Sequence, residues 1–171
     1  MRKSKISISG FKIGTAENRE GLTGVTVILA PDGGATAGVD VRGCAPGTRE
    51  TDLLDPRKTV QKIHAVVLSG GSAFGLEAAS GCVKYLAEQG VGFPIGNVCV
   101  PIVCSAVLFD LMIGDEKAYP DLLMGYEAAK SASSEFLSGC NGAGTGATVG
   151  KLLGFGNAMT VSYTHLTLPT T

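Results

Sequence analysis

The segment 140–151, CNGAGTGATVGK, constrains the fold of this chain most strongly. Four glycines and two threonines fall within its last ten residues. Glycine lacks a Cβ atom and adopts positive φ readily, so such a backbone can approach another group closely. Its N–H groups can converge on an anion or on the oxyanion of an acyl-transfer reaction. The alternative is a structural role, in which a tight turn leads into a helix packed closely on a sheet.

Neither of two nucleotide-binding motifs fits this segment. A Walker A loop needs glycine at position 145 and Ser or Thr at position 152, where the chain has Thr145 and Leu152. The letters of a dinucleotide fingerprint do occur at 142–147, but that motif follows a strand and opens a helix. The preceding residues 130–137 are typical of the end of a helix. We therefore expect no cofactor.

A second glycine-rich turn, Ser69-Gly70-Gly71-Ser72, follows a short apolar run. The run 64–68, HAVVL, is typical of a strand buried on both faces. Apolar residues after the turn repeat at helical spacing, with Ser72 in the position of an N-cap. A strand, a turn and a helix N-terminus form a recurrent place for an anion or an oxyanion. This turn is the better placed of the two candidate sites.

The remaining pattern predicts one domain of the α+β class. A chain of 171 residues is about one domain long. Apolar alternation and turn residues predict an antiparallel meander at the N-terminus and a helix later in the chain. The expected elements are strands at 6–13, 23–30 and 35–41, a hairpin or irregular strand at 93–104, and a helix from 119 to about 137.

The charged segment 42–56 is predicted to be a solvated loop, because glycine and proline interrupt it. An alternative is a paired cluster of four of its charged side chains at a site or subunit contact. That cluster would contain Arg42, Arg49, Glu50 and Asp52.

Composition excludes several classes of function. The net charge of −1 gives no indication of a nucleic-acid partner or an acidic membrane surface. No apolar run approaches the roughly 18 residues of a membrane-spanning helix, and no signal peptide is evident. Five cysteines without a C-x-x-C pair, and two histidines, offer no zinc-site spacing, so we expect no metal. The expected location is the cytoplasm.

No convincing pair of nucleophile and base is visible. His64 precedes an apolar run, where a lone histidine is more often structural than catalytic, and His165 lies in the last eleven residues. Thr148 and Lys151 have the spacing of an S-x-x-K motif, but threonine is the weaker nucleophile. The chain therefore offers hydrogen-bond donors for an oxyanion, but no evident nucleophile and base whose attack on a carbonyl would form that oxyanion.

Four segments resemble, in the same order, the self-processing aminopeptidases that include L-aminopeptidase/D-esterases and β-peptidyl aminopeptidases. They are 21–54, 65–93, 100–111 and 142–154. The resemblance implies an α-β-β-α layered fold similar to that of N-terminal nucleophile hydrolases, incomplete here at the C-terminus. We expect residues 1–160 to be the N-terminal part of one such domain.

The resemblance also implies a mechanism without histidine. In this family a precursor cuts itself before a Ser or Thr, and the freed α-amine, with a pKa of about 8, acts as general base. That nucleophile lies beyond the GAGTGAT loop, so it is expected to be absent from this chain, which alone should be inactive. The full-length protein is expected to hydrolyse N-terminal residues from small peptides, amides or esters, as a homo-oligomer of processed chains.

Site residues follow from the same resemblance. Asn141 is implied to contact the oxyanion or the substrate. The expected substrate-binding residues are Ser69, Gly70, Gly71, Ser72, Phe74, Gly142 and Gly144. Two alternatives stay open: an acyltransferase of similar architecture, and a non-catalytic protein that binds a small molecule.

The last residues, 161–171, do not resemble the family. They match the translation of a transposon-type sequencing adapter, so we expect a non-native tail. The alternative is a genuine short C-terminal strand.

Overall fold

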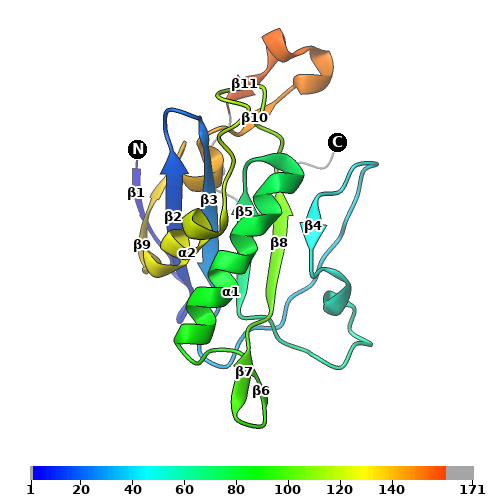
Figure 1. Cartoon of the computed structure of the whole chain (residues 1–171), viewed down its shortest axis with the longest axis vertical. Coiled ribbons are helices and arrows are strands. Elements are labelled where there is room, and N and C mark those ends of the chain that lie inside the picture. Colours follow the sequence, from blue (N-terminus) through cyan, green and yellow to red (C-terminus); the bar gives the residue numbers. More distant parts are fainter. Residues whose placement is uncertain (1, 161–171) are drawn as a thin grey trace.

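A five-stranded mixed sheet forms the centre of the computed structural model, which describes residues 2–160 (Figure 1). Only the β5–β8 pair is parallel in this sheet; its other three pairs are antiparallel. The strands, in spatial order, are β2 (Lys12–Asn18), β3 (Thr23–Leu29), β5 (Ala65–Ser69), β8 (Val103–Val107) and β4 (Thr48–Arg49).

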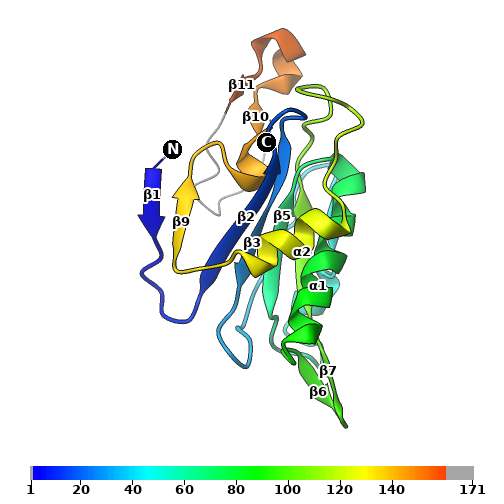
Figure 2. The same cartoon turned by 60° about the vertical axis from the view of Figure 1, so that its left-hand side comes forward.

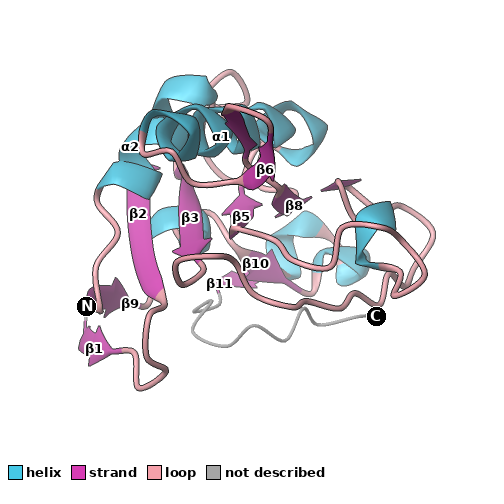
Figure 3. Ribbon diagram, turned by 90° about the horizontal axis from the view of Figure 1, so that it is seen from below, coloured by secondary structure: helices cyan, strands magenta, loops and turns pink. Residues whose placement is uncertain are grey.

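Two helices, α1 (Ala78–Glu88) and α2 (Leu122–Lys130), lie side by side on one face of the sheet (Figures 1 and 2). Figure 3 shows both helices together on the same side of the strands. The side chains of Val25, Val27 and Val67 are fully buried beneath them, because alternate residues of a strand point to the same face. Helices on one side of a mixed sheet confirm the α+β prediction.

Smaller elements complete the described chain. Strands β6 (Phe93–Ile95) and β7 (Val98–Val100) form a hairpin that projects beyond the ends of α1 and β8 (Figure 1). The remaining strands are β1 (Arg2–Lys5) paired with β9 (Glu135–Ser138), and β10 (Thr148–Val149) paired with β11 (Met159–Thr160). Short 3-10 helices occur at 52–54, 72–77, 142–144, 151–153 and 155–157.

The predicted meander is only partly confirmed. The strand expected at 23–30 is present as β3 (Thr23–Leu29), but the first strands are β1 and β2 rather than 6–13. The predicted strand 35–41 is wrong, since only Ala35 makes an isolated bridge, to Ile63. Both edges of β3 are already occupied, by β2 and by β5. The chain after the turn at Pro31 therefore has no place beside β3 and leaves the sheet.

The helix predicted from 119 to 137 is shorter than expected. Asp121 caps α2 by accepting a hydrogen bond from the Met124 N–H at 2.8 Å, but the helix ends at Lys130. Strand β9 follows, so the glycine-rich loop does come after a strand, contrary to the sequence interpretation. The loop opens only a three-residue 3-10 helix, and the context of a dinucleotide motif is still absent.

Ser72 does not act as an N-cap. Its φ is +53°, in the left-handed region, and the 3-10 helix that it starts has no side-chain cap. The hairpin predicted within 93–104 is confirmed as β6 and β7. The described part of the chain contains no helix long and apolar enough to cross a membrane.

The charged loop does not form the paired cluster considered as an alternative. Arg42 pairs with Asp40 at 2.6 Å, and both side chains are largely exposed. Arg49 reaches across to α1, where its Nη1 donates to Ser80 Oγ at 2.7 Å. The loop is therefore tied to the helix layer by Arg49, and Glu50 and Asp52 are not part of that contact.

The helices cross at two glycines that leave no room for a side chain. A Cβ atom on Gly81 would overlap the backbone of Leu122, and one on Gly125 would overlap the backbone of Ala78. This close approach lets the small residues Ala78 and Ala129 fill the core with no exposed surface. We predict that Gly81→Ala lowers the free energy of unfolding by about 1–3 kcal/mol, because the backbones must separate.

Urea denaturation of Gly81→Ala and of a matched variant measures this effect. Gly38→Ala is the control, because Gly38 has negative φ and open space around its Cα. Equal midpoints for both variants would show that the helices can separate without loss.

His64 is buried at the amino end of β5, where its Nδ1 accepts a hydrogen bond from the Ile102 N–H at 3.1 Å. Burial lowers the pKa of His64 below its usual 6.5, and Nδ1 can accept only when the ring is neutral there. The ring thus acts as a structural hydrogen-bond acceptor at the amino end of β5, and the Gly70 turn lies at the other end of this strand.

Because protonation of His64 favours the unfolded chain, its stabilising contribution is complete above pH 6.5 and is lost as pH falls towards the lowered folded-state pKa. We predict that the difference in urea midpoint between wild type and His64→Gln shrinks from pH 7.5 to pH 5. A difference that stays constant with pH would mean that the ring does not titrate between the two states.

Candidate active site

The sheet topology brings three chain segments to one edge. Strands β5 and β8 are parallel, so their carboxyl ends lie together, and the antiparallel β3 begins at the same edge. The turn after β5 and the segment after β8 are then joined by backbone bonds. Leu108 N donates to Ser69 O at 2.9 Å, and Ser72 N donates to Leu108 O at 2.9 Å. This edge faces β10 in Figure 1.

Asp110 is the buried charged residue at this edge, with 3% of its surface exposed. Its Oδ2 accepts a hydrogen bond from Thr23 Oγ1 at 2.7 Å, and its Oδ1 accepts one from the Gly71 N–H at 2.7 Å. Burying a carboxylate is costly unless hydrogen bonds replace water, and both oxygens have such a bond. Asp110 therefore joins the start of β3 to the turn after β5.

Glycines surround this carboxylate because side chains would not fit. A Cβ atom on Gly70 would overlap Asp110 Oδ2, and one on Gly146 would lie 2.9 Å from the same oxygen. The 142–146 loop thus packs directly against the group that holds the 69–72 turn. The two glycine-rich turns, which are far apart in the sequence, meet at one site.

The 142–146 loop is also fixed to the sheet. Gly142 N donates to Glu17 Oε2 and Ala143 N to Thr26 Oγ1, both at 3.1 Å. A Cβ atom on Gly24 would overlap the Gly142 carbonyl, so the loop backbone lies directly on β3. This part of the loop has the structural role that was one of the two interpretations of its sequence, although it leads into no regular helix.

Most N–H groups of the two turns already have acceptors. In the first turn Gly70 N donates to Gly24 O, and Gly71 and Ser72 donate as described above. In the second, Gly144 N donates to Asn141 O and Thr145 N to Gly142 O, both at 3.0 Å. These backbone groups position the turns rather than a substrate.

Gly146 and Ala147 are different: both are buried, and within residues 2–160 their N–H groups form no hydrogen bond. The hydroxyls of Thr145 and Thr148 on either side are buried without a partner among the same residues. Orphaned buried backbone N–H groups are rare in folded proteins. The loop therefore presents a short row of unused polar groups beside Asp110.

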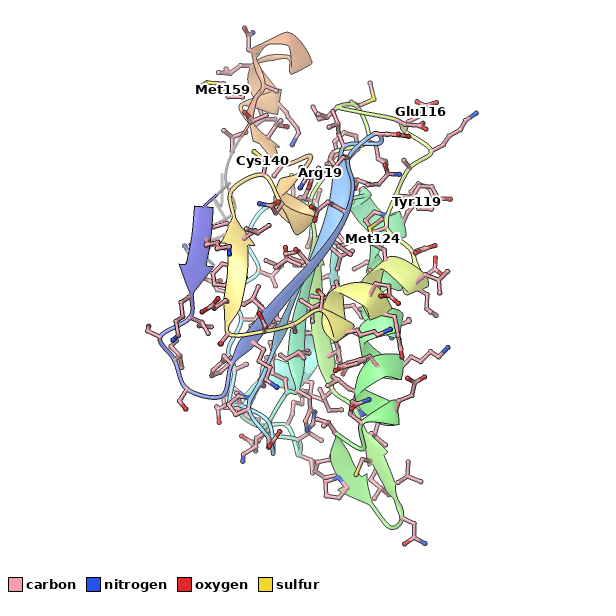
Figure 4. The ribbon with its side chains drawn as sticks, turned by 90° about the vertical axis from the view of Figure 1, so that its left-hand side faces the viewer. Arg19, Glu116, Tyr119, Met124, Cys140 and Met159 are labelled. Atoms are coloured by element: carbon pink, nitrogen blue, oxygen red, sulfur yellow. The ribbon has the colours of Figure 1, made fainter. Side chains whose placement is uncertain are left out.

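Asn141 is buried and held on both sides of its amide. Its Oδ1 accepts a hydrogen bond from Arg19 Nη2 at 3.0 Å, and its Nδ2 donates to Ser138 O at 3.2 Å. Arg19 is in turn paired with Glu17 at 2.5 Å. Figure 4 shows Arg19 beside Cys140, where the β2–β3 hairpin meets the loop after β9. Asn141 is therefore oriented by charged neighbours.

The other expected substrate-binding residues lie along the first turn. Ser69 is buried, and its Oγ donates to Gly70 O at 3.0 Å. Phe74 is 58% exposed and stacks on Tyr119, with 4.7 Å between the ring centroids. Tyr119 is labelled in Figure 4 on the segment that leads into α2. An exposed aromatic pair thus borders the turn.

Lys151 is half-buried just beyond the loop, and its Nζ donates to Thr148 O at 2.7 Å. Burial lowers its pKa, and the charge of Asp110 acts in the opposite direction. The described residues contain no group of three His, Cys, Asp or Glu side chains that could hold a metal ion.

Sequence reasoning missed Asp110 and Thr23. One signal was present: a single aspartate stands in the otherwise apolar run VLFDLMI, and a carboxylate in such a run is rarely buried without a specific partner. The sequence could not show that this partner is Thr23, 87 positions away.

A separate cavity of about 740 Å³ lies between the loop 37–48 and the strands β5 and β8. Val66, Leu68 and Cys104 are among its lining residues. None of the residues expected from the sequence to bind substrate lines it. The cavity is therefore not the place where the two turns meet.

The sequence matches the profile of peptidase family S58 over residues 6–165. An "uncharacterized aminopeptidase" of Mycobacterium tuberculosis is 47% identical over 131 residues, which cover 77% of this chain and 38% of the relative. A 6-aminohexanoate-oligomer endohydrolase of Kocuria sp. is 36% identical over 149 residues, which cover 86% of this chain and 39% of the relative. The chain thus spans less than half the length of these relatives.

Two solved structures share the fold. A β-aminopeptidase of Burkholderia sp. matches with a TM-score of 0.59 at 20% identity, over 81% of this chain and 41% of its own. A protein of Pyrococcus horikoshii matches with a TM-score of 0.58 at 22% identity, over 81% of this chain and 43% of its own. The expected likeness to the β-aminopeptidase fold is confirmed. The chain therefore belongs to peptidase family S58.

Proposed function

We propose that the complete protein is a self-processing serine-type aminopeptidase and that residues 1–160 form the N-terminal part of its single catalytic domain. Membership of family S58 supports the reaction class. The observation that carries the proposal is the meeting of two glycine-rich turns around Asp110, beside N–H groups of Gly146 and Ala147 that lack an acceptor among the described residues. Such groups stabilise the oxyanion of an acyl-transfer reaction.

In the proposed mechanism a Ser or Thr from the part of the protein beyond this chain attacks the substrate carbonyl. Its own α-amine takes the proton and later passes it to the leaving amine, so no histidine is required. The N–H groups of Gly146 and Ala147 donate to the developing oxyanion. Asn141 is a further donor, because its Nδ2 carries a second hydrogen besides the one given to Ser138 O.

The residues of the first turn are proposed to line the substrate side of the site. Ser69, Gly70, Gly71 and Ser72 bring the backbone close, and Phe74 offers an apolar face to the substrate acyl group. Gly142, which packs on β3, and Gly144 are proposed to line the opposite wall. Assembly of processed chains into a homo-oligomer belongs to the same proposal.

The direct test is hydrolysis by the complete gene product. We predict release of the N-terminal residue from amino-acid amides and p-nitroanilides, with 6-aminohexanoate oligomers and β-amino acid amides included in the panel. N-acetylated versions of the same substrates are the control, because an aminopeptidase requires a free amine. Absence of turnover on the whole panel, or equal turnover of the acetylated set, would overturn the proposal.

The 171-residue chain alone is predicted to be inactive on the same panel, because the proposed nucleophile lies outside it. The measurement is product release over a day at enzyme concentrations comparable to substrate, with intact-mass analysis for an acyl-enzyme. Turnover or acylation of this chain would mean that the nucleophile is one of its own residues.

A further inference from the structure

Asp110 occupies the centre of the candidate site without being available to a substrate. Its side chain is almost fully buried, and both of its oxygens accept hydrogen bonds from the protein. Because both oxygens already have donors within the protein, we assign the substrate amine to neither of them. Any effect of this carboxylate on the reaction must therefore pass through the groups that it holds.

We propose that Asp110 is a positioning residue, which fixes the N–H groups of Gly146 and Ala147 relative to the turn 69–72. This inference rests on the proposed hydrolase function. It differs from the roles that the sequence implied, because none of them involves Asp110 or Thr23.

The contacts form a short chain from β3 to the loop. Thr23, which is 1% exposed, is fixed at the start of β3 and donates to one oxygen of Asp110. The other oxygen accepts a hydrogen bond from the N–H of Gly71, whose φ is +80°. Gly146 packs between the Leu22 carbonyl oxygen, which an added Cβ would overlap, and Asp110 Cβ, which would lie 2.8 Å from that Cβ. Asp110 is thus one of the two groups that set the place of the loop, and a shift of the carboxylate shifts the two amides.

The charge of Asp110 matters as well as its shape. A bond from an N–H group to a carboxylate is shorter and about twice as strong as one to a neutral acceptor. Asp110→Asn keeps the shape, and the Thr23 hydroxyl can rotate to accept from the new amide. The substituted protein should fold, but the Gly71 N–H is held less firmly.

Kinetics of the complete gene product on its best substrate test the inference. We expect Asp110→Asn to lower kcat by about tenfold while KM changes by less than about twofold, because oxyanion donors act in the transition state. Thr23→Val, which removes the hydroxyl donor, should also lower kcat with little change in KM. Thr23→Ser, which keeps the hydroxyl, should have a kcat close to that of the wild type. Asp55→Asn is the charge-matched control, since Asp55 pairs with the exposed Arg57 away from the site.

Two kinetic results would overturn the inference: an unchanged kcat in Asp110→Asn and Thr23→Val, or equal losses in Thr23→Ser and Thr23→Val. A change in KM alone would also overturn it, because that is the sign of a substrate contact.

Amide hydrogen exchange in the complete gene product separates failure of this inference from failure of the proposed function. We expect Asp110→Asn to quicken exchange of the Gly71 amide by about tenfold and to move the resonances of Gly146 and Ala147, with Asp55→Asn as control. These changes would support the positioning role even if the complete product hydrolysed nothing. Unchanged exchange and resonances would overturn it even in an active enzyme.

Discussion

The buried carboxylate of Asp110 is the constraint on which the arrangement of this site depends. Removal of a carboxylate from water costs several kcal/mol in a protein, and only well-formed hydrogen bonds offset that cost. Here the donors come from Thr23 at the start of β3 and from Gly71 in the turn after β5. The order β3-β5-β8 and the parallel pairing of the last two strands are what bring those donors and Asp110 to one edge.

Glycines allow close backbone contact in both layers of the fold, at the site in the sheet layer and between the two helices. Gly24, Gly70 and Gly146 let backbone and carboxylate touch at the site. Gly81 and Gly125 let α1 and α2 cross with their backbones in contact above the sheet. These five glycines are explained by specific close approaches, whereas others, such as Gly33 and Gly96, have open space around them and positive φ. At the site, these approaches leave the Gly146 and Ala147 amides buried and without an acceptor among residues 2–160.

Local sequence signals predicted the elements whose contacts are local. The strand before Gly70 follows from an apolar run and is confirmed. The helix expected from 119 is present, and it begins at Leu122, after the cap Asp121. The end of α2 was wrong because residues 133–138 pair with β2 and β1, which lie more than a hundred positions earlier. The predicted strand 35–41 failed because β5 takes the edge of β3 that a meander would use.

The difference between local and long-range contacts also explains how much of the site the sequence could predict. Both glycine-rich turns were recognisable, since glycine clusters are visible within a few residues. Which of their amides remain available was not, because that depends on acceptors such as Glu17 and Thr26 from distant strands. The sequence analysis therefore favoured Gly142 and Gly144, whereas the unused N–H groups belong to Gly146 and Ala147.

The most direct test of the account is a crystal structure of the complete gene product with a slowly hydrolysed amide or ester trapped as its acyl-enzyme. The account predicts that the acyl carbonyl oxygen lies within hydrogen-bond distance of the Gly146 and Ala147 amides, with Asp110 still bound to Thr23 and Gly71. An acyl group bound in the cavity under the loop 37–48, or a carbonyl oxygen held by other donors, would contradict it.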